Sequence, residues 1–586
     1  MNNPLTFQPI DRMVKLPENY MPAGLSALRG EPGAQGRVLL EMRTWEEEID
    51  FAAVTAHQIG DLAFWDASLG QAARAEAIFC LGQPLDAPAA RSACRLAPSA
   101  ADIPLAGHEG RSAVVIIDHG IAFWNDRFRL GTAPGAPSRF QEVQFLSFED
   151  PGADEYQITV LTKAQIDGFC AQADAPGGQA KVIQTLGAMI PGCFYGSAAN
   201  PQGLWHGTAM ADLAAGAARD APDDRMLFGL ELPTAALRDW GGDTLQTLLM
   251  TALSAALRMV APVLEPGSTF RELVIVLAFG FPAGPQDGSH PAADLIRSFL
   301  AVMNARLGRK GFAVRLVLPA GNHLQDQCHA RLPAQDASGV PSVTWRVAPD
   351  DYSPNTVEIC VQTRSDPGLE VVAPDGSSAQ VTLQAGGFAP LIREGVMIGG
   401  VHRLPDRGGW AKLRLTLAAT VWRHPGPQPA PFGDWTLRVA ADAEAELWIL
   451  RDDRDVVADA TTPHRPSVFV DPAYLREDAQ GAPVIDDSGG GFVRRAGTAS
   501  VLTTARHADA VAVAASVANP SGGTMNASYS SLPRSSATGF AASVQIGDAG
   551  FREGVICAGN GSAQEFRILG TSAAAALHGR ALAGLG

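Results

Sequence analysis

Short apolar runs alternate with helical segments between residues 112 and 322. Residues 113–117 (AVVII), 273–279 (LVIVLAF) and 313–318 (AVRLVL) are apolar and rich in β-branched side chains, the pattern of strands buried on both faces. The helical segments between them are residues 204–219, 244–259 and 292–307. This alternation predicts right-handed crossovers and an α/β fold with a parallel sheet that carries helices on both faces.

From about residue 335 the hydrophobic pattern changes to a period of two. Seven short candidate strands are separated by Gly, Pro and Asp turns, at residues 343–348, 357–363, 379–385, 396–403, 411–421, 434–440 and 445–451. Such spacing favours an all-β sandwich or jelly roll. The α/β pattern resumes with an apolar run at 510–517 and an Ala-rich helix opened by Gly570, Thr571 and Ser572. We therefore expect the all-β unit to be an insertion within the α/β fold.

The length of 586 residues is consistent with several structural units. The pattern predicts an N-terminal segment of unknown role, a first part of the α/β domain, an inserted all-β domain, a linker, and a second part of the α/β domain. These units are residues 1–110, 111–334, 335–465, 466–495 and 496–586.

Composition excludes some classes of partner. Lys and Arg number 45 against 61 Asp and Glu, for a net charge of −16, which disfavours a nucleic-acid binder. No apolar run reaches the roughly 18 residues of a membrane span, and the first residues do not have the pattern of a signal peptide. Seven scattered cysteines, none in a CxxC pair, indicate neither a disulfide framework nor a zinc site. We expect a cytoplasmic protein without membrane or nucleic-acid partners.

Four polar residues stand at the ends of predicted strands or the starts of predicted helices. A hydroxyl nucleophile needs a base, a carboxylate that orients the base, and donors for the oxyanion. Asp118 follows the first apolar run, His206 opens the motif HGTAM, Asn322 ends LPAGN, and Ser572 lies in LGTSAAAA. Because the carboxyl ends of parallel strands share one edge of a sheet, these residues are expected to meet there.

The order Asp, His, Asn, Ser with these flanks resembles the subtilisin-like serine proteases. The resemblance covers about residues 112–334 and 496–586. It implies that Asp118 orients the base, His206 is the base, Asn322 donates to the oxyanion and Ser572 is the nucleophile. His119 stands where the family usually has Ser or Thr, and Ala209 and Ala576 replace a frequent His and Pro.

The same resemblance implies a substrate site and no cofactor. Ala278, Phe279 and Gly280 match the strand that pairs with extended substrate. The opposite wall of the specificity pocket would be Leu318, Pro319, Ala320 and Gly321. The expected activity is a regulated, intracellular serine endopeptidase acting on polypeptides. The alternative is a catalytically silent scaffold that binds a protein partner through the all-β domain, and residues 1–110 could also hold the enzyme latent.

Other interpretations of single motifs are weaker. Ser488 in DSGG and His57 in VTAH resemble motifs of chymotrypsin-like proteases, but those are antiparallel barrels. His119 and His323 flank the expected site, yet no third ligand has helical or turn spacing to them, so no metal is expected. The acidic run 451–455 is interleaved with arginines and indicates a turn more than a calcium site. The tryptophans at 345, 435 and 448 are expected in the sandwich core instead of on a carbohydrate platform.

Overall fold

A computed structural model describes most of residues 112–584. The longer gaps are 149–155, 191–204 apart from Cys193 and Tyr195, 218–224, 234–248, 261–270, 422–428, 451–465, 536–539 and 549–553. Between residues 1 and 111 it describes the short stretches 5–7, 38–41, 58–59, 62–65 and 77–78.

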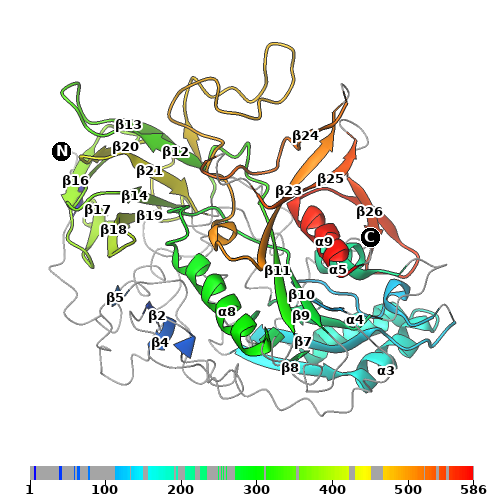
Figure 1. The fold of residues 1–586 in the computed structure, drawn as a ribbon. Coiled ribbons are helices and arrows are strands. Elements are labelled where there is room, and N and C mark those ends of the chain that lie inside the picture. The colour runs from blue at the N-terminus through cyan, green and yellow to red at the C-terminus, as the bar shows by residue number, and fades with distance from the viewer. Residues whose placement is uncertain are drawn as a thin grey trace.

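A mixed, largely parallel sheet forms the centre of the α/β part (Figure 1). Its nine strands run in the order β24-β23-β11-β10-β6-β9-β7-β8, and β25 also pairs with β23. The five central strands are mutually parallel: β23 (Ala510–Ala518), β11 (Ala313–Pro319), β10 (Glu272–Leu277), β6 (Ser112–Asp118) and β9 (Leu227–Glu231). The outer strands are β7 (Phe140–Phe148), β8 (Tyr156–Thr162), β24 (Thr524–Asn526) and β25 (Ala542–Asp548).

Helices cover both faces of this sheet, as the alternating pattern predicts. One hydrophobic cluster joins the sheet to α5 (His206–Ala215), α9 (Thr571–Leu582), α3 (Lys163–Asp174) and α4 (Gly178–Met189). A second cluster on the other face contains α8 (Pro291–Gly308). It also contains the described helical positions within the predicted segment 244–259, which are Leu249, Ala252, Leu253, Ala255, Ala256 and Met259.

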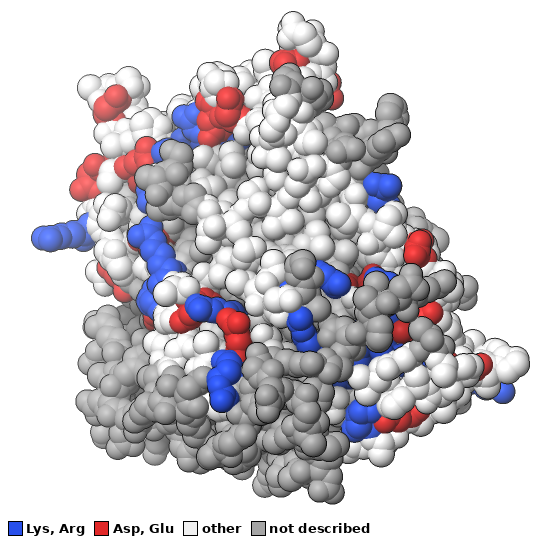
Figure 2. All heavy atoms as spheres, turned by 45° about the vertical axis from the view of Figure 1, so that its right-hand side comes forward, with Lys and Arg blue, Asp and Glu red and all other residues white. Residues whose placement is uncertain are grey.

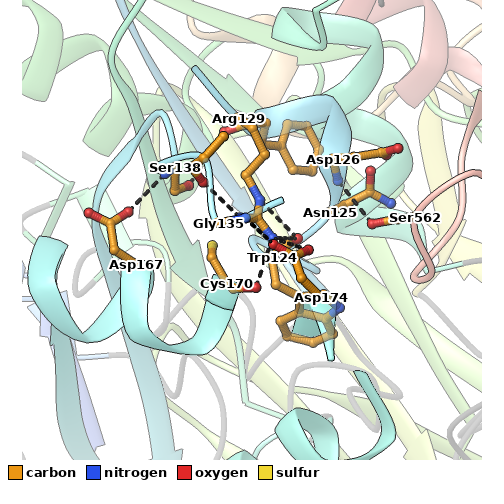
Figure 3. A network of polar contacts seen from close by, with 12 residues as sticks. Trp124, Asn125, Asp126, Arg129, Gly135, Ser138, Asp167, Cys170, Asp174 and Ser562 are labelled. Carbon is orange, nitrogen blue, oxygen red and sulfur yellow. Dashed lines mark hydrogen bonds and ion pairs between the residues drawn. The ribbon is translucent and has the colours of Figure 1, made fainter. Parts of the chain in front are cut away.

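The described residues between Asp118 and His206 form several helices and strands. These are β7, β8, α3 and α4, together with a short 3-10 helix, Asp126–Phe128. The buried Arg129 guanidinium donates to the carbonyls of Trp124, Ala136 and Cys170 and pairs with Asp174, which ties the segment after β6 to α3 (Figure 3). Helix α3 is therefore anchored to the part of the chain that follows Asp118.

Two antiparallel sheets are formed, apart from β1, by strands that lie between β11 and β23 in the sequence. A seven-stranded sheet has the order β1-β17-β18-β19-β14-β21-β12, and a five-stranded sheet has the order β16-β15-β20-β13-β22. One hydrophobic cluster takes residues from both sheets and includes Trp345 and Trp435. This arrangement agrees with the sandwich-like pattern of alternating residues.

Each of the seven candidate strands corresponds to an observed strand. These are β13 (Ser342–Val347), β14 (Asn355–Val361), β16 (Ser378–Thr382), β18 (Val396–Arg407), β19 (Trp410–Leu417), β20 (Gly433–Ala440) and β21 (Ala445–Ile449). The pattern did not predict β12 (His329–Leu332), β15 (Gly368–Val372), β17 (Phe388–Arg393) or β22 (Val468–Val470). Because β12 and β22 belong to these sheets, the sheets extend beyond residues 335–465 on both sides.

Smaller elements complete the described chain. β1 (Thr6–Phe7) pairs with β17, so residues near the N-terminus join the seven-stranded sheet. The strands β2 (Val38–Glu41), β3 (Gln58–Ile59), β4 (Leu62–Trp65) and β5 (Ala77–Ile78) form a separate sheet. β26 (Val555–Ala558) and β27 (Glu565–Ile568) form a hairpin, and Val501–Thr504 forms a 3-10 helix. Among the described residues, no helix combines the length and apolar character needed to cross a bilayer.

Candidate active site

Asp118 and His206 occupy the positions that the sequence pattern predicts for them. Asp118 is the last residue of β6, and His206 is the first residue of α5. The backbone N–H of Gly207 donates to the His119 carbonyl at 2.8 Å, which fastens the start of α5 to the loop after β6. A Cβ at Gly207 would lie 2.6 Å from that carbonyl oxygen, so the close approach requires glycine.

The structure brings Asp118 and His206 into a hydrogen-bonded pair. His206 Nδ1 lies 2.8 Å from Oδ2 and 2.9 Å from Oδ1 of Asp118. Burial opposes ionisation of Asp118, but the charge of His206 and hydrogen bonds from His119 and His206 outweigh it and hold the pKa of Asp118 below its usual value. Burial lowers the pKa of His206, but Asp118 outweighs burial and raises it. The pair is therefore an ionised carboxylate that orients an imidazole of increased basicity.

Asn322 lies against the residue that precedes Ser572. Its Oδ1 accepts the backbone N–H of Thr571 at 3.0 Å and the Thr571 hydroxyl at 3.1 Å. The same hydroxyl accepts the backbone N–H of Gly321 at 3.0 Å. Since Thr571 engages the amide oxygen, the Nδ2 group of Asn322 is the remaining donor. It lies beside Gly570, 3.4 Å from where a Cβ would be if that residue had one.

Ser572 lies at the N-terminus of α9, where helical N–H groups have no intrahelical partner. Its Oγ donates to the Ala278 carbonyl at 2.9 Å, and not to His206. Ala278 follows Leu277, which is in register with Ile117, the residue before Asp118. Neighbouring strands lie about 4.8 Å apart. Ser572, which contacts the residue after β10, and Asp118, which ends the neighbouring strand β6, are therefore at the same edge of the sheet.

The expected substrate segments differ in how much of their backbone is already bonded. Phe279 and Gly280 are partly exposed, and the structure shows no hydrogen bond from their backbone groups to any other described residue. Ala320 is buried, its N–H donates to Val513 and its carbonyl accepts from Ser500. Leu318 is also buried, and Pro319 ends β11. The segment 278–280 therefore retains backbone groups for a ligand, whereas 318–320 is buried and Gly321 is partly exposed.

Sequence reasoning missed Glu231 and Tyr195. The fully buried Glu231 carboxylate accepts the backbone N–H groups of Gly120 and Ile121, the latter at 3.0 Å, in the loop after Asp118. The Tyr195 hydroxyl donates to the Ile121 carbonyl at 2.7 Å. Burial raises the pKa of Glu231 to about 8, although the two backbone donors act against it. For Glu231, the signal in the sequence was an acidic residue at the end of the apolar run LFGLE, residues 227–231.

The weaker motifs have other environments. Ser488 is exposed and its Oγ donates to Asp486 in a turn, while His57 and the acidic run 451–455 lie outside the described residues. Trp345, Trp435 and Trp448 are fully buried. Trp345 and Trp435 lie in the core between the two antiparallel sheets, as expected, whereas Trp448 packs in a separate cluster with Cys360 and Trp410.

His119 joins the candidate site through its side chain. Its Nδ1 lies 3.2 Å from Asp118 Oδ1, and its ring stacks on that of His206 with centroids 5.5 Å apart. One ligand atom from each of Asp118, His119 and His206 falls within 4.8 Å of the others, a spacing compatible with a metal ion. By contrast, His323 pairs with Asp326.

Charge on the face shown in Figure 2 is scattered. Lys and Arg side chains lie at separate positions, many beside Asp or Glu, and a broad central area holds neither. Among the described residues of this face, Lys and Arg are therefore interspersed with acidic and uncharged residues.

Comparison with known proteins supports the fold. No family model matches the sequence, and no curated protein matches it. The solved structure of the Clostridium perfringens CspB protease is similar to the chain, with a TM-score of 0.51 and 13% sequence identity over 81% of each chain. At this identity the similarity is one of fold. The chain thus has a mixed α/β fold similar to that of a protease.

Proposed function

We propose that the protein is a subtilisin-like serine endopeptidase that hydrolyses peptide bonds through an acyl-enzyme on Ser572. The observation that carries the proposal is the Asp118–His206 pair at the same sheet edge as Ser572 and Asn322. A structural role alone gives no reason for an ionised carboxylate, an oriented imidazole and a helix-start serine to meet there.

In the proposed reaction, His206 removes the proton from Ser572 as Oγ forms a bond to the scissile carbonyl carbon. The Ser572 hydroxyl must first turn from the Ala278 carbonyl toward His206 Nε2, a side-chain rotation that substrate binding would favour. The peptide C–N bond then breaks as His206 returns the proton to the leaving amine. Water attacks the acyl-enzyme by the same route and restores Ser572.

The oxyanion would be held by two donors. Asn322 Nδ2 is the side-chain donor, because Thr571 engages the Oδ1 atom of the same amide. The backbone N–H of Ser572 is the second donor, and the N-terminus of α9 adds its positive dipole end. These donors are already oriented before the charge develops, which is the condition for an effective oxyanion hole.

The proposed substrate is an extended polypeptide. It would pair with the backbone groups of Phe279 and Gly280 and lie against the segment 318–321. We further propose that the two antiparallel sheets form an inserted all-β domain, that the enzyme acts in the cytoplasm, and that a protein partner regulates it.

The test is hydrolysis of a quenched fluorescent peptide library by the full chain. We expect cleavage that Ser572→Ala abolishes and that Ser488→Ala, a change in an exposed turn, leaves intact. Cleavage that survives in Ser572→Ala would overturn the proposal.

The hydrogen bond from Ser572 to Ala278 is the observation that favours the second candidate, a silent scaffold that binds a partner. A folded wild-type chain that cleaves no peptide, and remains inactive after removal of residues 1–110, would support it.

A further inference from the structure

We propose that Asp118, His119 and His206 form a binding site for one divalent transition-metal ion, such as Zn²⁺, and that the bound ion blocks His206 as a base. The binding site stands on geometry alone, whereas the block rests on the proposed protease function. His206 is far from His119 in sequence, so the triple becomes visible only when α5 packs on the loop after β6.

The ligand set suits such an ion. Two imidazole nitrogens and one carboxylate oxygen are ligands that zinc and copper accept. Their donor atoms lie within 4.8 Å of one another, with His119 Nδ1 at 3.2 Å and His206 Nδ1 at 2.8 Å from Asp118 oxygens. Ligands about 2.1 Å from a tetrahedral ion are roughly 3.4 Å apart. The distances from Asp118 to His119 and His206, 3.2 and 2.8 Å, would therefore open by roughly 0.2 and 0.6 Å, while the two histidine nitrogens, which lie within 4.8 Å of each other, would settle at the same separation.

The site is open to solvent on one side and anchored on the other. His119 and His206 side chains are 24% and 31% exposed, whereas Asp118 is 1% exposed. The backbone N–H of His119 donates to Asp118 Oδ1 at 2.8 Å, which holds the carboxylate in place. An ion can therefore arrive from solvent and find a positioned carboxylate, with its fourth ligand position left for water.

Metal binding would remove the lone pair that catalysis needs. With Nδ1 of His206 bonded to the ion, the neutral ring carries its proton on Nε2, and Nε2 no longer has a lone pair for the Ser572 proton. If the ring begins neutral with its proton on Nδ1, that proton is exchanged through solvent to Nε2, and if the ring begins doubly protonated, the Nδ1 proton leaves to solvent as the ion binds. The ion thus replaces the proton shared between Asp118 and His206, and no oxidation or reduction takes place.

His119 supplies the third ligand. A hydroxyl there would leave only Asp118 and His206, two ligands instead of three. His119→Ser therefore removes one ligand while placing a small polar residue at a partly exposed position. His323→Ser is the matched control, because His323 also pairs with a carboxylate, that of Asp326, but lies outside the cluster.

The binding test uses the full chain carrying Ser572→Ala, which prevents self-cleavage. Zn²⁺ affinity is measured by calorimetry, and Co²⁺ is added in parallel because its visible absorption reports coordination geometry. We expect one ion per chain at this site, affinity at least about 10-fold weaker in His119→Ser, and no change in His323→Ser. No binding, or equal affinity with and without His119, would overturn the site.

The inhibition test uses the active chain. Zn²⁺ should inhibit peptide hydrolysis reversibly, with chelator restoring the rate, and His119→Ser should need at least about 10-fold more Zn²⁺ for half-inhibition. Hydrolysis that continues with the ion bound would overturn the block. A chain that binds Zn²⁺ through His119 but cleaves no peptide would leave the metal site standing and refute the protease function instead.

Discussion

Glu231 offers a prediction that does not depend on catalysis. Its buried carboxylate holds the loop after Asp118 through the N–H groups of Gly120 and Ile121, and burial raises its pKa from 4.5 to about 8. The folded state therefore keeps a proton on Glu231 that the unfolded state releases near pH 4.5. Stability contributed by this proton is present at low pH and declines as the pH rises toward 8. Glutamine cannot ionise, so Glu231→Gln should remove this decline.

The magnitude follows from the pKa difference. The interval from 4.5 to about 8 corresponds to an upper bound on the order of 5 kcal/mol at 1.36 kcal/mol per pH unit. Between about pH 6 and about pH 9, roughly 3 kcal/mol of this falls within the measured range. With about 2.1 cal/mol/K of unfolding entropy per residue, a chain of 586 residues should show a shift of the thermal midpoint of roughly 2 °C.

The assay compares thermal midpoints of Ser572→Ala with and without Glu231→Gln at the two pH values. As the pH rises, the thermal midpoint of the glutamine variant should increase relative to that of its parent. Glu358→Gln is the control, because Lys412 and Arg414 outweigh burial and hold the pKa of this buried glutamate at about 2. The Glu358→Gln variant should lose the same amount of stability at both pH values. A midpoint difference for Glu231→Gln that stays constant from pH 6 to pH 9 would refute the reasoning.

Three further predictions address the site and its support. Asn322→Ala should lower kcat roughly 100- to 1000-fold with little change in KM, and steady-state kinetics that show an unchanged kcat would place the oxyanion hole elsewhere. Because Asp118 raises the pKa of His206 above 6.5, log kcat/KM should fall as pH drops through a value above 6.5, and a limb below 6.5 would contradict this. Arg129→Met should lower the free energy of unfolding by roughly 3 kcal/mol, since buried carbonyls of Trp124 and Cys170 lose their donor, and an unchanged denaturation midpoint would argue against this network.

The candidate site could be predicted where local pattern and topology act together. Asp118 ends a buried apolar run and His206 opens a helix, so the polar residue and the element boundary coincide in sequence. Ser572 follows Gly570, whose φ of 125° marks the turn into α9. Such boundaries are visible in sequence because burial stops where the polar residue begins.

Long-range contacts could not be predicted in the same way. In the sequence, Glu231 is a single acidic residue at the end of an apolar strand. That its carboxyl group binds backbone N–H groups follows only from the pairing of β9 with β6, which places it beside the loop after β6. β1 pairs with β17 across almost 400 positions, which no local pattern signals. The short strands β12 and β22 lack enough alternating positions for a period of two to stand out.

The most direct test of the central claim is labelling of the folded full-length chain by a fluorophosphonate probe, followed by mass spectrometry of the modified peptide. Such a probe reacts with a serine hydroxyl that a neighbouring base activates. The account predicts a single label on Ser572, lost in Ser572→Ala and kept in Ser488→Ala. A chain with native circular dichroism that takes up no label, or takes it up elsewhere, would contradict the claim that Asp118, His206 and Ser572 form an activated nucleophile.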